Sequence, residues 1–496
     1  MVNIGYAHDG LIGSVQEQLR RAQKEIGFTY LRFHGIFDDD MHIYQENEDG
    51  SPWFNFAYAD LLFDFIQEIG LIPYVELGYM PSKLAKTQYT VFDNPAICIS
   101  MYNDSEKWQA LVQACLSHWI DKYGLANVRK WRFTVFSMNY SRLQYTAPVM
   151  SHEDYCKMFE ATYQTIKMID PELKLGGAGC FPGIALAPDG LRRFLLDVKE
   201  HGCPPDFITV QCYPHEDFSQ DSDFFYFTSK QTSMPSVLSK DKNFTLHFLQ
   251  WLNRIRQEIG FADCPVVVEE WNSTLWQRDL SGDTCYKAAW LIKNVLQNYD
   301  QAEYLPYWLL TDFLDEWLVP GGVFHGGYGL FTINGIPKAG YQALRMLGRI
   351  GERKIASGEG WFVSRTENTI QVYLYHYCHY DPLYRYRYQK LTDPHDAYKV
   401  FEVDGRLKIE LELCGLDPGV YRQESWTLNR SAGSAFDKWL EMEAPRVMTP
   451  EDLNYLNDMA QPLCKIRDAD TAGALHLQTE LEPHEVRLIV LKKRDG

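Results

Sequence analysis

The stretch Glu25-Ile26-Gly27-Phe28-Thr29-Tyr30-Leu31-Arg32-Phe33-His34 contains the pattern that decides the fold. Apolar residues at helical spacing precede it, Gly27 is a natural stop for a helix, and a strand-like run follows from 28 to 34. The tripeptide Glu-Ile-Gly returns at 68–70 and 258–260, and each time an apolar or aromatic run comes next. We therefore predict that one helix-then-strand unit is reused along the chain.

Strand-like runs alternate with amphipathic helical stretches from the first residues to about position 350. Eight strands are expected, at 2–6, 28–34, 71–78, 128–136, 174–179, 206–212, 265–271 and 304–312. Eight strands alternating with eight helices predict an α/β fold, a (β/α)8 TIM barrel over residues 1–350. A doubly wound open sheet is the alternative, but no Gly-rich phosphate loop follows the first strand. Alternating segments beyond 351 predict an accessory β-sandwich over residues 351–496, with a short helix near 450–458.

The composition excludes several classes of protein. With 496 residues, 46% of them hydrophobic, the chain is expected to be globular and larger than one core usually supports. A net charge of -18 without a Lys/Arg cluster predicts no direct contact with nucleic acid. No apolar run reaches the roughly 18 residues of a membrane span, and no secretory signal is present. The 11 scattered cysteines lack metal-ligand spacing, so we expect a cytoplasmic protein with reduced thiols and no metal or organic cofactor.

Candidate functional residues follow the apolar runs, because the chemistry of a barrel of this kind collects at the C-terminal ends of its strands. Glu269 and Glu270 follow three valines, and their side chains are expected on opposite faces of the strand, one toward the barrel mouth. The pattern does not say which one, and a structural carboxylate bonded to an Arg is an equal alternative. His34 could bind a ligand hydroxyl or be a core residue, and Asp38-Asp39-Asp40 is expected to be a solvated loop. Further polar or aromatic strand ends are Glu76, Gln211, Tyr213, Trp308 and Asp312, with His325 in a following loop.

Four segments resemble, in order and at matching intervals, motifs of glycoside hydrolase family 39, whose best-known members are retaining β-xylosidases and α-iduronidases. The segments are Leu31–Gly35, Pro73–Ser82, Glu270-Trp271-Asn272 and Phe324–Leu330. The resemblance covers nearly the whole chain and implies that Glu270 occupies the nucleophile position. It also implies sugar contacts at His34, Tyr213 and Trp308, and a ligand of the xylose or xylo-oligosaccharide type.

The sequence departs from the family pattern at the other half of the catalytic pair. The acid/base Glu falls on Met138, and Ser137 stands for the Asn that precedes it. Gln211 replaces a common His, and Asp315-Glu316 replaces a Glu pair, so these positions and Ser137 are expected as altered sugar contacts. Retaining hydrolysis needs two carboxyl groups about 5–5.5 Å apart, and a thioether cannot transfer a proton. Losing a general acid/base costs about 10²–10⁴ in rate, so we expect very slow turnover of natural glycosides.

Three functional hypotheses remain. Met1 directly precedes the first barrel strand, and similar barrels with a degraded strand-four motif occur behind AraC-type regulators of sugar genes, a subgroup that the overall sequence resembles. We therefore expect the C-terminal, sugar-sensing part of such a regulator, catalytically impaired and able to form a homo-oligomer. The first alternative is an active retaining glycosidase with Glu270 as nucleophile and a proton donor borrowed from Glu216, Asp315 or Glu316. The second is a structural barrel without a ligand.

Overall fold

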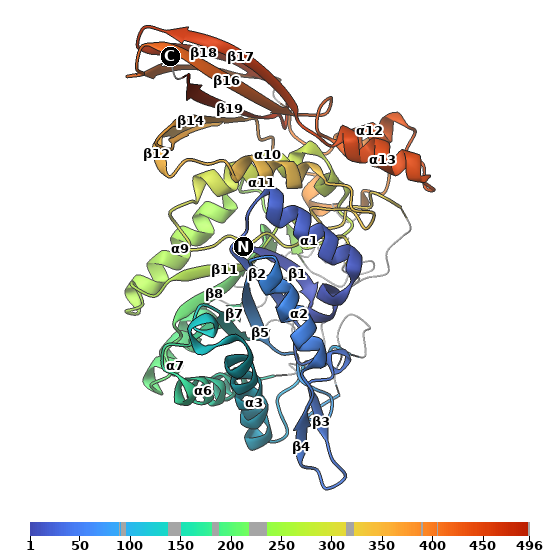
Figure 1. The fold of residues 1–496 in the computed structure, drawn as a ribbon, viewed down its shortest axis with the longest axis vertical. Coiled ribbons are helices and arrows are strands. Elements are labelled where there is room, and N and C mark those ends of the chain that lie inside the picture. The colour runs from blue at the N-terminus through green and yellow to red at the C-terminus, as the bar shows by residue number, and fades with distance from the viewer. Residues whose placement is uncertain are drawn as a thin grey trace.

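The computed structural model describes residues 1–88, 90, 96–136, 150–180, 188–217, 236–313, 322–387, 390–403 and 405–494. A barrel surrounded by helices makes up the larger part, and a layer of antiparallel strands covers one side of it (Figure 1). The α/β class, the TIM barrel and the C-terminal β domain predicted from the sequence are confirmed. No helix in the described ranges combines the length and the apolar character that crossing a membrane requires.

Seven parallel strands form the wall of the barrel, each hydrogen-bonded to the next. In sheet order they are β1 (Val2–Tyr6), β2 (Tyr30–His34), β5 (Ile72–Leu77), β6 (Arg132–Val135), β7 (Lys174–Cys180), β8 (Phe207–Cys212) and β11 (Val266–Trp271). All seven overlap strands predicted from the apolar runs. Their right-handed connections carry the helices to the outside of the sheet.

The eighth strand, predicted at 304–312, is not a regular strand. Tyr304 makes an isolated parallel bridge to β11, and Tyr307 bridges to both β11 and β1. At this place the buried side-chain amide of Asn3 on β1 donates to the backbone carbonyls of Glu269 (3.1 Å) and Tyr307 (3.2 Å). A side chain therefore supplies part of the bonding that a continuous backbone ladder would make, and the barrel closes through this seam.

The outer helices end where the repeated tripeptide predicts. α1 (Gly13–Glu25), α2 (Ala57–Glu68) and α9 (Phe244–Glu258) each end at the Glu of a Glu-Ile-Gly sequence. The following glycines have φ of +80°, +74° and +76°, a left-handed conformation that side chains other than glycine rarely adopt. Among the described residues the other outer helices are α3 (Ser105–Tyr123), α4 (Leu125–Val128), α6 (His152–Ile169), α7 (Pro188–Glu200), α10 (Cys285–Gln297) and α11 (Ala339–Leu347).

The C-terminal part contains a six-stranded antiparallel sheet and a two-stranded one. The first has the order β12 (Arg353–Gly358), β13 (Trp361–Arg365), β14 (Thr369–Tyr375), β19 (Val486–Lys493), β16 (Gly419–Leu428) and β17 (Leu463–Thr471). The second pairs β15 (Leu407–Cys414) with β18 (Ala474–Leu481). Val372, Ile489 and Leu477 belong to one buried apolar cluster shared by the two sheets, which makes the arrangement a sandwich.

Helices α10 and α11 lie between the barrel and the large sheet (Figure 1). The hydroxyl of Tyr373 on β14 donates to the carbonyl of Met346 on α11, at 2.9 Å, across this contact. We propose the predicted limits 1–350 and 351–496 for the two domains, since β12 begins at Arg353. The predicted short helix is α13 (Pro450–Met459), and α12 (Ala435–Glu441), which was not predicted, packs beside it.

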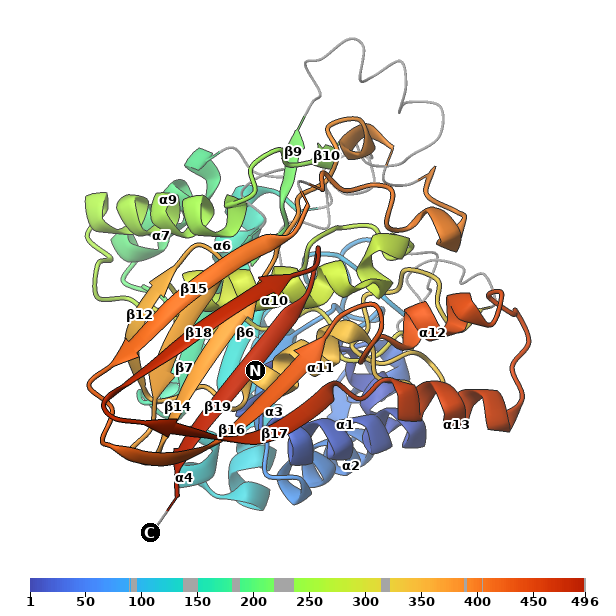
Figure 2. The same cartoon turned by 90° about the horizontal axis from the view of Figure 1, so that it is seen from above.

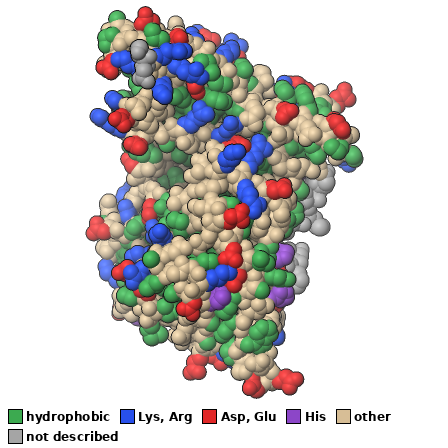
Figure 3. Space-filling model, in the orientation of Figure 1, with side chains coloured by type: hydrophobic (Ala, Val, Ile, Leu, Met, Phe, Trp, Pro, Cys, Tyr) green, Lys and Arg blue, Asp and Glu red, His purple; other side chains and the backbone are tan. Residues whose placement is uncertain are grey.

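Two hairpins extend from the barrel. β3 (Tyr44–Glu46) and β4 (Pro52–Phe54) project away from the sandwich, as Figure 1 shows. β9 (His215–Asp217) and β10 (Ser236–Leu238) follow β8 and rise at the edge seen in Figure 2. Lys and Arg side chains are mixed with Asp and Glu side chains over most of the face in Figure 3.

The seam at Asn3 leads to a test of the barrel closure. Asn3→Ala removes two buried hydrogen bonds, so it should lower the free energy of unfolding by about 1–3 kcal/mol. Urea unfolding followed by tryptophan fluorescence measures the change. Asn47→Ala is the control, because the Asn47 side chain bonds only the exposed Ser51 among the described partners. Equal stability of the two variants would contradict the role of Asn3.

Candidate active site

Four charged side chains meet inside the barrel, near the C-terminal ends of three strands. Arg32 comes from β2, Glu76 from β5, and Glu269 and Glu270 from β11, and none is more than 5% exposed. Arg32 Nη1 donates to Glu270 Oε1 at 3.0 Å, and its Nη2 donates to Glu76 Oε2 at 2.6 Å. Arg32 Nη2 also lies 3.9 Å from Glu269 Oε1. One guanidinium therefore faces three carboxyl groups.

The two adjacent glutamates do not divide between opposite faces, and that expectation from strand alternation is wrong. The pairing of β11 with β8 shifts between Val268 and Glu270, so Glu269 is the extra residue of a β-bulge. A bulge re-aims successive side chains, which here leaves both carboxyl groups beside Arg32. The second oxygen of Glu269 accepts a hydrogen bond from the Tyr74 hydroxyl at 3.5 Å.

Glu270 is held at both of its oxygens. Oε1 accepts from Arg32, and Oε2 accepts from the hydroxyl of Tyr213, 3.2 Å away, just beyond β8. Burial raises the pKa of Glu270, while the charge of Arg32 and the two hydrogen bonds oppose that rise. These bonds favour the ionised form and fix the direction of the carboxylate, the arrangement that a nucleophile requires.

The other two carboxyl groups, those of Glu76 and Glu269, have more strongly raised pKa values. Burial raises the pKa of Glu76 to about 8 and that of Glu269 to about 7, against the opposing charge of Arg32. A single buried positive charge cannot balance three buried negative ones, so a proton stays in this cluster at neutral pH. Burial raises the pKa values of Glu76 and Glu269 most, so these two carboxyl groups are the sites that hold this proton.

His34 lies above Arg32 on the same face of β2 and is enclosed by aromatic rings. Its ring centroid is 4.8 Å from that of Tyr6, 5.1 Å from Trp308 and 5.6 Å from Tyr79. Burial, and then the charge of Arg32, lower the pKa of His34, so the imidazole is neutral. Neither ring nitrogen has a hydrogen-bond partner among the described residues. A satisfied core histidine would have one, so this geometry favours contact with a ligand.

The loop after β2 is not solvated at its first acid, contrary to the sequence-based expectation. Asp38 is 2% exposed and accepts a hydrogen bond from the backbone N–H of Tyr79 at 3.0 Å. Asp39 likewise accepts from the N–H of Ser82. These acids bind the loop after β5 and place the ring of Tyr79 beside His34.

Trp308 is positioned by the motif that contains Glu270. The backbone N–H of Trp308 donates to the backbone carbonyl of Trp271 at 3.0 Å. The backbone carbonyl of Trp308 accepts from the Asn272 side-chain amide. The buried Lys287 donates in turn to Asn272 Oδ1 at 2.6 Å. The Glu-Trp-Asn sequence therefore carries both the presumed nucleophile and the group that anchors an aromatic wall.

Five of the predicted site residues lie on neighbouring strand ends: His34, Gln211, Tyr213, Glu270 and Trp308. Gln211 pairs directly with Glu270 across β8 and β11. Ser137, Met138, Asp315 and Glu316 lie outside the described residues, and so does the side chain of Glu216.

No sequence pattern predicted a role for Arg32, Tyr6 or Tyr79. A charged residue inside an otherwise apolar strand was the available signal for Arg32, because such residues are rarely buried without a partner.

The barrel and a buried, doubly hydrogen-bonded carboxylate at the end of β11 define the class as TIM-barrel glycosidases. The model of glycosyl hydrolases family 39 matches residues 4–476, and the chain belongs to this family. The membership predicted from the four motifs is therefore confirmed.

The chain is similar in sequence to two β-xylosidases. The Geobacillus stearothermophilus protein is 26% identical over 481 residues, which are 96% of this chain and 89% of that protein. The Caldicellulosiruptor saccharolyticus protein is 34% identical over 346 residues, covering 68% of this chain and 65% of that protein.

A structure and a different kind of relative complete the comparison. The crystal structure of a monomeric β-xylosidase from Caulobacter crescentus CB15 matches with a TM-score of 0.86 at 22% identity, covering 100% of this chain and 96% of that one. An uncharacterized HTH-type transcriptional regulator of Staphylococcus aureus is 21% identical over 230 residues, which are 46% of this chain and 29% of the regulator.

The shared proton leads to a prediction of pH dependence. Since folding raises the pKa of Glu76 from 4.5 to about 8, the folded state keeps a proton that the unfolded state releases between these values. Stability from this group is therefore complete below about pH 4.5 and declines as the pH rises toward 8. Glu76→Gln imitates the protonated acid, so the variant should gain stability relative to the unmodified chain between pH 5 and pH 8.

Urea unfolding at several pH values measures this difference. Glu68→Gln, at a carboxylate whose side chain is 61% exposed, is the control and should give a nearly constant difference. A difference for Glu76→Gln that stays constant from pH 5 to pH 8 would contradict the shared proton.

Proposed function

We propose that this chain is a saccharide-binding barrel of family 39 in which glycoside cleavage is impaired, serving as the sensing part of a sugar-responsive transcription regulator. The observation that carries the proposal is Met138 in the sequence position of the acid/base, in a chain whose Glu270 is oriented by two hydrogen bonds. Binding needs a shaped and hydrogen-bonding pocket, whereas cleavage also needs a proton donor.

The surroundings of His34 support binding of a sugar. His34 offers two ring nitrogens without a partner among the described residues, and a neutral imidazole both donates and accepts. Tyr6, Tyr79 and Trp308 surround it with aromatic faces, which suit the apolar C–H face of a sugar ring. The β-xylosidase relatives favour a ligand of the xylose or short xylo-oligosaccharide type.

The chemistry of residue 138 supports impaired cleavage. In retaining hydrolysis the leaving oxygen takes a proton from the acid/base, which then removes one from water. A methionine thioether carries no proton to give. Glu270 could still displace a leaving group that departs as a stable anion, but an unactivated sugar alkoxide would leave very slowly.

The proposed regulatory role is supported by the regulator relatives and by charge. The Staphylococcus aureus protein shares 230 aligned residues with this chain, and these make up 29% of its length. The net charge of -18 disfavours contact between this chain and DNA, so a separate segment would bind DNA. A cytoplasmic location follows from this role.

An active retaining β-xylosidase is the second candidate. The β-xylosidase relative that matches 96% of this chain and the two hydrogen bonds that orient Glu270 favour it. In that case Glu216, Asp315 or Glu316 would supply the proton in place of the residue at 138.

Sugar binding can be measured by isothermal titration calorimetry with xylose, xylobiose and a panel of other short saccharides. We expect binding of at least one sugar, and about fivefold weaker binding in His34→Phe, because a hydrogen bond is worth about 1 kcal/mol and tenfold is 1.4 kcal/mol. His476→Phe, an exposed change on β18, is the control and should bind normally. No heat of binding with any sugar at millimolar concentration would contradict the proposal.

Cleavage assays distinguish the two candidates. The unmodified chain should release dinitrophenol from a dinitrophenyl xyloside and leave xylobiose intact, and Glu270→Gln should abolish the dinitrophenol release. Met138→Glu should raise the rate on xylobiose by about 10²–10⁴. Cleavage of xylobiose by the unmodified chain at about 10 s⁻¹, a typical enzyme turnover, and its loss in Glu270→Gln would instead establish the active enzyme.

A further inference from the structure

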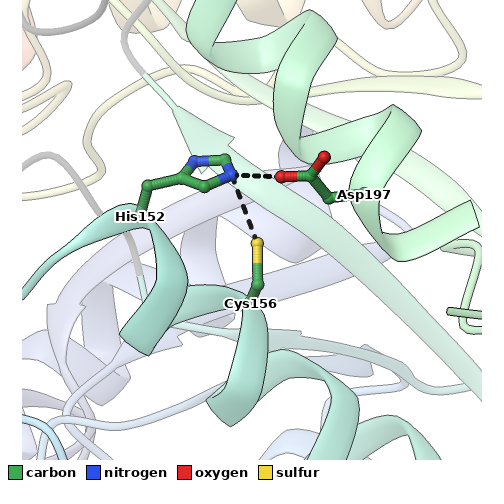
Figure 4. A group of neighbouring side chains, drawn as sticks. All are labelled: His152, Cys156 and Asp197. Atoms are coloured by element: carbon green, nitrogen blue, oxygen red, sulfur yellow. Dashed lines mark hydrogen bonds and ion pairs between the residues drawn. The ribbon is translucent and has the colours of Figure 1, made fainter. Parts of the chain in front are cut away.

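Three side chains of metal-binding type meet between α6 and α7 on the outside of the barrel. His152 is the first residue of α6, Cys156 follows one turn later, and Asp197 lies on α7 (Figure 4). His152 Nε2 is 2.7 Å from Asp197 Oδ2 and 3.5 Å from Cys156 Sγ. All three potential ligand atoms lie within 4.8 Å of one another. This cluster is separate from the strand-end site around Glu270.

The positions of these side chains are set by contacts other than those within the cluster. Residues four apart lie on one face of a helix, which brings His152 and Cys156 together. The Ser151 hydroxyl caps α6 by accepting from the N–H of Asp154 at 3.0 Å. Arg193–Glu153 (2.6 Å) joins the same two helices, and His201, the residue after α7, pairs with Glu160 of α6 at 2.5 Å. The cluster therefore sits on a prepared framework.

We propose that His152, Cys156 and Asp197 form a binding site for a borderline-soft divalent metal ion, with Zn²⁺ as the best match and water as the fourth ligand. Imidazole nitrogen, thiolate sulfur and carboxylate oxygen are the ligands that Zn²⁺ takes. Metal–ligand bonds of about 2.0–2.3 Å in a tetrahedron place ligand atoms about 3.3–3.8 Å apart. The nitrogen–sulfur distance of 3.5 Å already meets this requirement.

The carboxylate of Asp197 has to move for an ion to bind. The nitrogen–oxygen distance of 2.7 Å is that of a hydrogen bond and must open by about 0.6 Å to reach tetrahedral spacing. The side chain of Asp197 is 36% exposed and that of His152 is 14% exposed, so the carboxylate can rotate and an ion can enter from solvent. The imidazole would then carry its proton on Nδ1 and bind the metal through Nε2.

The surrounding charges favour a cation at this place. Asp197, Glu160 and Glu153 are negative charges near the Cys156 thiol, and Arg193, 3.6 Å from Asp197, is the positive charge among them. The negative charges attract a divalent ion, which replaces the thiol proton: Cys–SH and M²⁺ give Cys–S⁻–M²⁺ and H⁺.

The site differs from what the sequence predicts. Spacing along the chain shows no Cys-x-x-Cys pair, and only the packing of α6 on α7 adds the third ligand. A bound ion would tie the first turn of α6, the helix that begins at His152, to its neighbour. It would stabilise the folded chain in proportion to the logarithm of the metal concentration.

Cobalt and zinc test the proposal on the intact chain after treatment with a chelator. One equivalent of Co²⁺ should bind and give a thiolate-to-cobalt absorption band in the near ultraviolet. Adding Zn²⁺ should displace the Co²⁺ and remove this band. Cys156→Ser should abolish the band and weaken Zn²⁺ binding by more than tenfold, since even changes beyond the ligands cost about 10–100-fold. Cys414→Ser removes an exposed thiol on β15 and should change neither result.

Two further variants keep the test independent of the buried cysteine. His152→Gln and Asp197→Asn alter partly exposed side chains, and each should weaken Zn²⁺ binding and remove the rise in melting temperature that Zn²⁺ causes. The absence of a one-equivalent thiolate band would overturn the proposal. Zn²⁺ affinity that stays within twofold in all three variants would also overturn it.

Discussion

The arrangement of the barrel interior depends on the ion pairing of one buried guanidinium. This group belongs to Arg32 and lies among Glu76, Glu269 and Glu270. A buried charge is tolerated only when it is paired and hydrogen-bonded, so the side chains from β2, β5 and β11 cannot be placed independently. The planar fork of the guanidinium directs its two ends to Glu270 and Glu76. It thereby orients Glu270, and its single positive charge offsets only part of the negative charge that three ionised carboxylates would carry.

The barrel departs from regular geometry where it builds this site. The bulge at Glu269 turns two consecutive carboxyl groups toward Arg32. On the other side of β11, the Asn3 amide bonds the carbonyls of Glu269 and Tyr307 where the eighth strand would be. Bulges and irregular strand ends lower local regularity, and proteins keep them where a side chain must be aimed. Irregularity on both sides of β11 is therefore a property of the site rather than a defect of the fold.

The described half of the site is organised for recognition as well as for attack. Glu270 is oriented by Arg32 and Tyr213, and the neutral His34 stands among aromatic rings with both nitrogens available among the described residues. Binding a sugar and transferring a proton to its leaving group use different side chains, so the two properties of such a site can change separately.

The sequence alone determined the repeated helix-then-strand unit, the glycine helix ends, seven barrel strands, the family and the strand-end residues His34, Gln211, Tyr213, Glu270 and Trp308. Local periodicity, backbone conformation and short motifs encode these features within a few residues of chain. Tertiary structure decided the rest: the pairing of Arg32 with a carboxylate 238 residues away, the bulge, the side-chain seam at Asn3, the burial of Asp38 and the meeting of His152 with Asp197. Each of these depends on distances between segments far apart in the chain, and no local pattern contains such distances.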